Sequence, residues 1–227
     1  MEATLLIGGF WAAFAGTYVW LSSARTRAAL IERVGPQPFQ GIYSLVALAT
    51  FVPLVWIFAR HKHAGPLLWI TLGPPTIARA VNYTLMALAM ILFVASLLPS
   101  STPPSSMAAH GPATAHGILR ITRHPMLASF GVFGVAHVLM NGSLGDVLFF
   151  GGFPLFAWIG GRHQDSRKMR EVSGYTALME ATSIAPFAAI VAGRQRLVLR
   201  ELPIAALAIG LALAIVVRTY HHQLFGP

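Results

Sequence analysis

Histidine carries most of the ligand chemistry available to this chain. The sequence has nine histidines and no cysteine, so disulfides, thiolate metal sites and cysteine nucleophiles are excluded. His137 lies within a mostly apolar run that begins at Pro125 and stops at Asn141-Gly142. An ionisable group in such a run is costly to bury unless something binds it. Two readings of His137 follow: a core histidine bonded to a backbone carbonyl, or an axial ligand of a metal or haem.

A basic cluster, Arg120, Arg123 and His124, stands directly before that run. Pro125 suits the first position of a helix, where a backbone N–H has no helical partner. Helix starts attract anions through free N–H groups and the helix dipole. The cluster is therefore read either as a topological anchor or as a site for a phosphate, a carboxylate or a lipid headgroup.

Carboxylates are scarce and poorly placed for acid–base catalysis. None of the seven lies in the middle of an apolar stretch, which argues against a hydrolase with two membrane-buried carboxylates. Asp165 and Arg167 are expected to face the same side as Arg123 and His124, where they would complete a polar mouth or form a structural ion pair.

The composition is that of a membrane protein. Of 227 residues, 56% are hydrophobic and only 10% are charged, with a mean hydropathy of +0.66. A net charge of +9 would suggest nucleic acid in a soluble protein. Here the charges lie between apolar stretches, so we expect contact with anionic lipids and none with nucleic acid.

The apolar stretches predict an all-α, polytopic integral membrane bundle of about six transmembrane helices. A Ser/Pro-rich connector is expected over 99–112 and an interfacial, non-spanning segment over 184–192. The first stretch lacks a basic n-region and is expected to remain as a span. The six spans are expected at 3–23, 41–59, 81–98, 125–140, 144–159 and 203–217.

The basic residues predict the orientation. With the N-terminus outside, twelve of the sixteen Lys and Arg residues fall in inner segments. The positive-inside rule therefore favours both termini outside the cytoplasm, in a bacterial-type inner membrane. On a helix, His124 and His137 are roughly 20 Å apart and cannot bind one iron. The end of the bundle that contains His137 is expected to contain also His61, His63, His221 and His222. The last two, near the C-terminus, are expected to be solvated.

Six separated motifs stand in this sequence: Arg120–Pro125, Ala136-His137, Asn141-Gly142, Asp165-x-Arg167, Ser183–Gln195 and Tyr43–Val46. Together they resemble the NnrU family, in which case residues 1–227 form one NnrU-like transmembrane domain. Some members of that family are haem b-dependent cis-trans isomerases of carotenoid biosynthesis, and bacterial members are associated with nitrite and nitric oxide metabolism (denitrification).

The resemblance implies a haem b site. Carried over by position, the haem-linked histidine of the isomerases matches His137, and a second family histidine matches His61. Tyr18 stands where the family has a histidine, and tyrosine can also ligate ferric haem. Gly134 stands where the isomerases have a cysteine. The hypothesis is that His137 is the axial ligand and catalytic residue, with His61 as its partner, acting on an apolar polyene that enters from the bilayer.

Two alternatives stay open. Isoprenylcysteine carboxyl methyltransferases show a more distant likeness, because they also have an Arg-His-Pro motif at a helix start that holds S-adenosylmethionine. Arg123 and His124 would bind that cofactor here. The other alternative is a non-catalytic subunit or assembly factor of a larger membrane complex.

Overall fold

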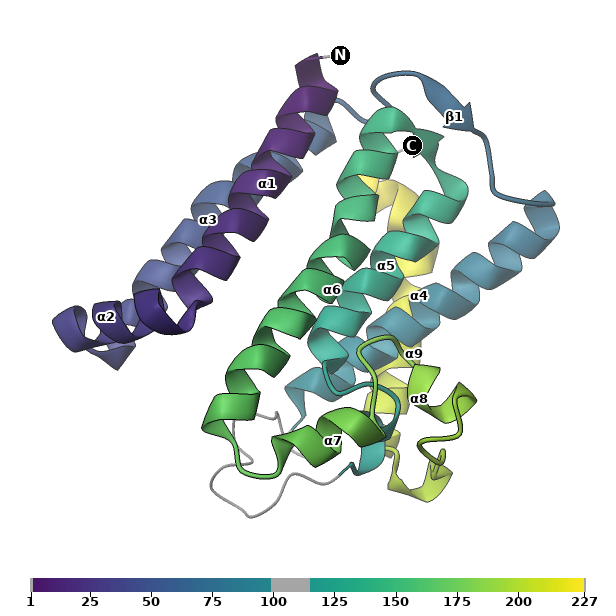
Figure 1. Cartoon of the computed structure of the whole chain (residues 1–227). Coiled ribbons are helices and arrows are strands. Elements are labelled where there is room, and N and C mark those ends of the chain that lie inside the picture. The colour runs from purple at the N-terminus through teal and green to yellow at the C-terminus, as the bar shows by residue number, and fades with distance from the viewer. Residues whose placement is uncertain (1, 99–114, 227) are drawn as a thin grey trace.

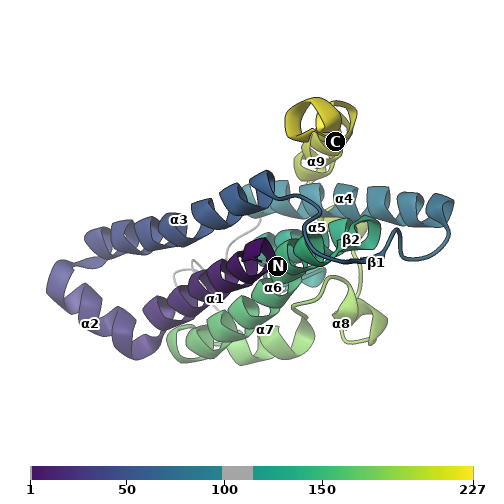
Figure 2. The ribbon, with the colours of Figure 1, turned by 90° about the horizontal axis from the view of Figure 1, so that it is seen from above.

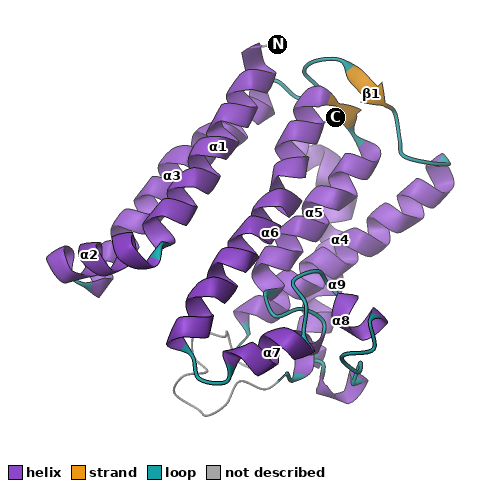
Figure 3. Cartoon of the chain, viewed as in Figure 1, coloured by secondary structure: helices purple, strands orange, loops and turns teal. Residues whose placement is uncertain are grey.

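The computed structural model describes residues 2–98 and 115–226, which are mostly helical (Figures 1 and 3). In chain order the elements are α1 (Glu2–Ser22), α2 (Ala24–Val34), α3 (Pro36–Arg60), β1 (Leu67–Trp69), α4 (Pro75–Leu97), η2 (Gly117–Arg120), α5 (Pro125–Met140), β2 (Gly142–Ser143), α6 (Leu144–Glu171), α7 (Tyr175–Ala181), α8 (Ala188–Val191), η3 (Leu199–Glu201) and α9 (Ile204–Phe225).

The expected membrane architecture is confirmed. In the described residues, the five helices α1, α3, α4, α6 and α9 are long and apolar enough to cross a bilayer. The remaining apolar helix, α5, has 16 residues and is therefore about 24 Å long, shorter than the roughly 30 Å hydrocarbon layer. It packs lengthwise between α4 and α6. The chain is thus a multi-pass, all-α membrane protein.

Two groups of helices make up the bundle. Helices α5 and α6 form a hairpin, α4 lies against α5, and α9 lies against α4 (Figures 1 and 2). Helix α1 joins α3 to this group by packing on both α3 and α6. Trp11 makes that junction, since its indole nitrogen donates to the carbonyl of Phe149 at 3.0 Å. A Cβ atom at Gly152 would lie 2.2 Å from the same indole ring, so α1 can approach α6 closely only because residue 152 is glycine.

Helices α5 and α6 also meet through a glycine. A Cβ atom at Gly134 would lie 2.3 Å from the carbonyl oxygen of Phe150 and 2.6 Å from the ring of Pro154. Real Cβ atoms do not come so close to backbone, and small residues are what permit such helix contacts in membranes. The separation of the two helices is therefore set by the absence of a side chain at residue 134.

Both chain termini lie at one end of the bundle, which we call the terminal end (Figure 1). Strands β1 and β2 pair antiparallel there, with Leu67 opposite Ser143, and Lys62 donates to the carbonyl of Phe225. Helices α2, α7 and α8 lie at the opposite end. The prediction that both termini share one side is confirmed, whereas the prediction that this side faces away from the cytoplasm stays a prediction.

The loop region at the opposite end contains the segment expected to be interfacial. Its helix α8 has four residues and is fastened to the start of α5 by backbone bonds, from Phe187 to Ile121 at 2.9 Å and from Arg123 to Ser183 at 3.1 Å. It is too short to cross a bilayer, as expected. The predicted connector at 99–112 lies outside the described residues.

Candidate functional site

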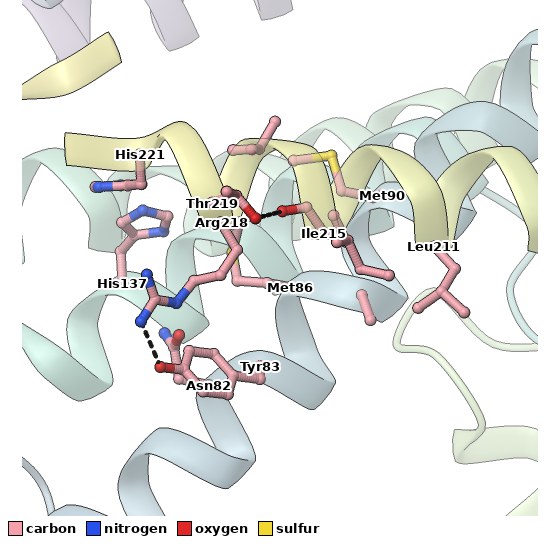
Figure 4. A pocket seen from close by; sticks show the side chains of 13 residues that line it. Asn82, Tyr83, Met86, Met90, His137, Leu211, Ile215, Arg218, Thr219 and His221 are labelled. Carbon is pink, nitrogen blue, oxygen red and sulfur yellow. Dashed lines mark hydrogen bonds between the residues drawn. The ribbon is translucent and has the colours of Figure 1, made fainter. Parts of the chain in front are cut away.

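A cavity of about 340 Å³ lies between α4, α5 and α9 near the terminal end. Figure 4 shows His137 and His221 at the same end of this cavity, with Arg218 and Tyr83 beside them. The polar and sulfur-bearing side chains that line it are Asn82, Tyr83, Met86, Met90, His137, Arg218, Thr219 and His221.

The imidazole of His137 is held in one orientation. Its Nδ1 lies 2.9 Å from the carbonyl oxygen of Phe133, and its ring stacks on Phe150 with 4.4 Å between centroids and 20° between planes. Because a carbonyl oxygen only accepts, Nδ1 must carry the proton, and Nε2 keeps its lone pair. This backbone-fixed tautomer is the one that histidine ligands of metals use. His137 can therefore act as a base or a ligand through Nε2.

The helices around His137 are fastened by polar contacts. Asn82 on α4 donates to the carbonyl of Ala136 at 2.7 Å. Arg218 on α9 donates to the hydroxyl of Tyr83 at 2.8 Å and lies over the same ring, 5.1 Å from its centroid. The cavity thus combines two imidazoles with one guanidinium, and none of its lining side chains is a carboxylate.

A second cavity, of about 350 Å³, continues along α5. It shares Met90 and Val217 with the first, and we call the two together the α4–α5–α9 groove. From His137 to Ser129 the groove follows roughly 12 Å of helix α5. The walls of the second cavity are almost wholly apolar and comprise Ala89, Met90, Phe93, Ser129, Phe130, Phe133, Phe153, Leu213 and Val217.

His61 lies at the terminal end but does not line this groove. It ends α3, and its Nδ1 bonds to the carbonyl of Ile57 at 3.1 Å, the same arrangement as in His137. The histidine that lines the first cavity together with His137 is His221, and His221 is also exposed, as expected. Within residues 2–98 and 115–226, no group of three or more His, Asp or Glu side chains is arranged to hold a metal ion.

Tyr18 lies at the other end of the bundle. Its hydroxyl accepts from Gln164 on α6 at 2.9 Å, whereas His137 stacks on Phe150 of the same helix. The fourteen residues between these two positions correspond to roughly 21 Å. Tyr18 and His137 therefore do not meet at one site, although the family resemblance grouped them.

The basic residues before α5 are occupied by carboxylates. Asp165 accepts from Arg123 at 2.6 and 3.0 Å, from Nε2 of His124 at 2.7 Å and from the hydroxyl of Tyr175 at 2.6 Å. Burial raises the pKa of Tyr175, so its phenol stays a neutral donor. All four side chains are buried. This network joins the start of α5 to α6 and α7 and turns the donors of Arg123 and His124 toward Asp165.

Arg120 is neutralised in a similar way. Its Nε and Nη2 donate to the two oxygens of Glu201 at 2.7 and 2.9 Å, and the backbone N–H of Gly117 adds a third bond at 3.0 Å. The hydrogen bond from Arg120 is the main reason why the pKa of Glu201 falls to about 2. The pair ties η2 to η3. Arg123 and His124, the residues named for the methyltransferase alternative, donate to Asp165 in this structure.

Fold and groove define a class of protein: a polytopic helical membrane protein with an apolar groove that ends at a fixed imidazole. The family model described as NnrU protein matches residues 5–227, so the chain belongs to the NnrU family.

Two curated relatives carry the name "15-cis-zeta-carotene isomerase, chloroplastic". The one from Zea mays is 28% identical over 169 residues, which is 72% of this chain and 45% of the relative. The one from Arabidopsis thaliana is 29% identical over 174 residues, which is 71% of this chain and 44% of the relative. The chain thus matches less than half the length of either plant protein. No solved structure matches.

The cysteine that the resemblance implied at residue 134 has no room here. Any side chain at this position would meet the backbone of Phe150, so α5 and α6 would have to separate to admit a thiol. Whatever chemistry this chain performs at His137 therefore uses an imidazole without a neighbouring thiol at position 134.

Proposed function

We propose that this protein isomerises a cis double bond of an apolar polyene inside the membrane. The observation that carries the proposal is the α4–α5–α9 groove, an apolar passage with Nε2 of His137 at one end. The names of the two plant relatives supply the substrate class, a carotenoid with a cis bond at position 15.

The groove has the properties that a polyene requires. Its walls along Phe93, Phe130 and Phe133 offer aromatic faces and almost no hydrogen-bonding groups, and a hydrocarbon chain needs none. Met90 lines both cavities, and Met86 lines the first. Methionine side chains adapt to different shapes, which suits a site that must hold both a bent and a straight isomer.

We further propose that the cavity beside His137 holds haem b. The donor set fits such a group: Nε2 of His137 would be a nitrogen ligand of the iron, His221 would offer a second imidazole, and Arg218 could pair with a carboxylate. A haem bound there would supply an iron centre that withdraws electron density from the polyene and so weakens the bond that rotates. The carbonyl of Phe133 and the ring of Phe150 would hold the imidazole of His137 in place. The apolar walls of the groove would exclude water.

Isomerisation is tested directly in proteoliposomes. The purified protein, expressed with added haem, is incubated in darkness with 15-cis-zeta-carotene, and the isomers are separated by chromatography. We expect the 15-trans isomer to accumulate with the wild-type protein and to fall to the protein-free level with His137→Ala. His222→Ala is the matched control, because this neighbouring histidine does not line the groove. An unchanged isomer ratio with the wild-type protein contradicts the proposal.

Haem binding has its own test. The absorption spectrum of the detergent-solubilised protein is expected to contain a Soret band that disappears in His137→Ala and shifts in His221→Ala. A band that survives His137→Ala unchanged contradicts the assignment of His137 as the ligand, and His61→Ala then becomes the variant to measure.

A further inference from the structure

A third cavity, of about 430 Å³, lies at the end of the bundle opposite to the groove. Residues of α1, α2, α3 and α6 line it, and none of them lines the α4–α5–α9 groove. Its polar walls come from all four helices, and we call it the α1–α3–α6 cavity. The side chains that matter below are Tyr18, Arg27, Tyr43, Ser44, His163 and Arg167.

The charge of this cavity is positive and not neutralised from within. Arg27 and Arg167 line it, and no carboxylate does. Arg27 is positioned by its stacking over Phe39, 5.2 Å from the ring centroid. Arg167 has only a loose partner, since its Nε lies 3.8 Å from Glu171, whose side chain is about half exposed. The nearby Asp165 cannot help, because Arg123, His124 and Tyr175 occupy it.

One buried atom at this cavity has no partner. Among the described residues, Nε2 of His163 is the buried side-chain nitrogen or oxygen atom without a hydrogen bond. A buried polar group left in this state costs free energy that a ligand can recover. Next to it, Gln164 and Tyr18 bond to each other and hold the wall in place. Two guanidiniums without a lining carboxylate, beside an imidazole nitrogen without a partner, favour an anionic ligand.

We propose that the α1–α3–α6 cavity binds a phosphate group. Phosphate matches this donor set, because guanidinium groups hold its oxygens through charge-assisted, often bidentate, hydrogen bonds. The cavity lies at the end of the spanning helices, the depth at which lipid headgroups are found. The phosphate therefore belongs either to the headgroup of an anionic lipid or to a soluble phosphate compound. This proposal is independent of the function proposed for the groove.

The test compares two double variants of equal charge. Arg27→Gln/Arg167→Gln removes the cavity's guanidiniums. Arg25→Gln/Arg170→Gln removes two exposed arginines of the same helices, neither of which lines the cavity. Each purified protein, in neutral detergent, is titrated calorimetrically with inorganic phosphate, dihexanoyl phosphatidylglycerol and, as a zwitterionic reference, dihexanoyl phosphatidylcholine.

We expect the cavity variant to weaken binding of the anionic probe at least tenfold and the control variant to change it less than twofold. Binding of phosphatidylglycerol alone identifies a lipid headgroup, and binding of inorganic phosphate identifies a soluble ligand. If the wild-type protein binds neither anionic probe, or if both double variants weaken binding equally, the proposal is overturned. Ser44→Trp, which adds bulk to the cavity wall without changing charge, must give the same loss and replaces the cavity variant if that variant fails to fold.

Discussion

Replacing Asp165 by asparagine should destabilise the protein more than any other single change at the polar end of α6. Asp165 compensates the buried guanidinium of Arg123 and also accepts from His124 and Tyr175. Removing one partner of a buried ion pair leaves an uncompensated charge and costs about 3–5 kcal/mol. Tyr175→Phe removes one bond to the same carboxylate, for about 1.5–3 kcal/mol.

The assay is reversible unfolding in mixed micelles of increasing dodecyl sulfate content, followed by circular dichroism. Glu171→Gln is the control, because its contact with Arg167 is long and largely exposed, and such pairs contribute about 0–1 kcal/mol. The expected order of destabilisation is Asp165→Asn, then Tyr175→Phe, then Glu171→Gln. If Asp165→Asn unfolds within 1 kcal/mol of the wild-type protein, the network does not anchor α5 to α6.

Two further predictions concern stability. Gly134→Ala forces a methyl group against the carbonyl of Phe150 and should cost about 1–3 kcal/mol in the same micelle assay; Gly151→Ala, where a Cβ meets nothing within 4 Å, is its control, and an equal effect of both contradicts the packing argument. The depressed pKa of Glu201, about 2, means that the stability due to this carboxylate is fully present above its unfolded pKa of about 4.5 and is lost as the pH falls toward 2. Glu201→Gln should therefore flatten the pH dependence of stability between about 4.5 and 2, and an unchanged acid profile contradicts the role of the pair.

The membrane architecture could be predicted from the sequence because span length and loop charge are local properties. Each expected apolar stretch contains a helix, and the short link Asn141–Ser143 does join two antiparallel helices. The bounds expected for α5, 125–140, match the helix Pro125–Met140, because Pro125 fixes the start and Asn141 the end. The helix is therefore shorter than the bilayer. The length of α5 is thus set by the residues that begin and end the helix, Pro125 and Asn141, and not by the hydrophobicity of the stretch.

The partners of the polar residues could not be predicted with the same success. Asp165 joins Arg123 and His124 as expected, but Arg167 does not. Residues two apart on a helix point in different directions, so α6 turns Asp165 toward α5 and Arg167 toward the α1–α3–α6 cavity. Helical periodicity alone therefore predicts that these two side chains point in different directions.

The groove depends on tertiary packing that no local pattern encodes. His221 meets His137 because α9 packs against α4, which itself packs against α5. The sequence does indicate the membrane depth of the two histidines, since it predicts both at one end of the bundle. Depth alone does not tell which helices are neighbours, and His61, at the same end, does not line the groove.

The most direct test of the proposed polyene site is the conversion rate of a variant in which the groove is filled. Met90 lines both cavities of the groove, so Met90→Trp should obstruct an extended substrate at the point where they join. Met169→Trp is the matched control, at an exposed methionine outside the groove. We expect Met90→Trp to isomerise 15-cis-zeta-carotene at least tenfold more slowly than the wild-type protein and Met169→Trp to retain the wild-type rate. Isomerisation by Met90→Trp at the wild-type rate would contradict the assignment of this groove as the active site.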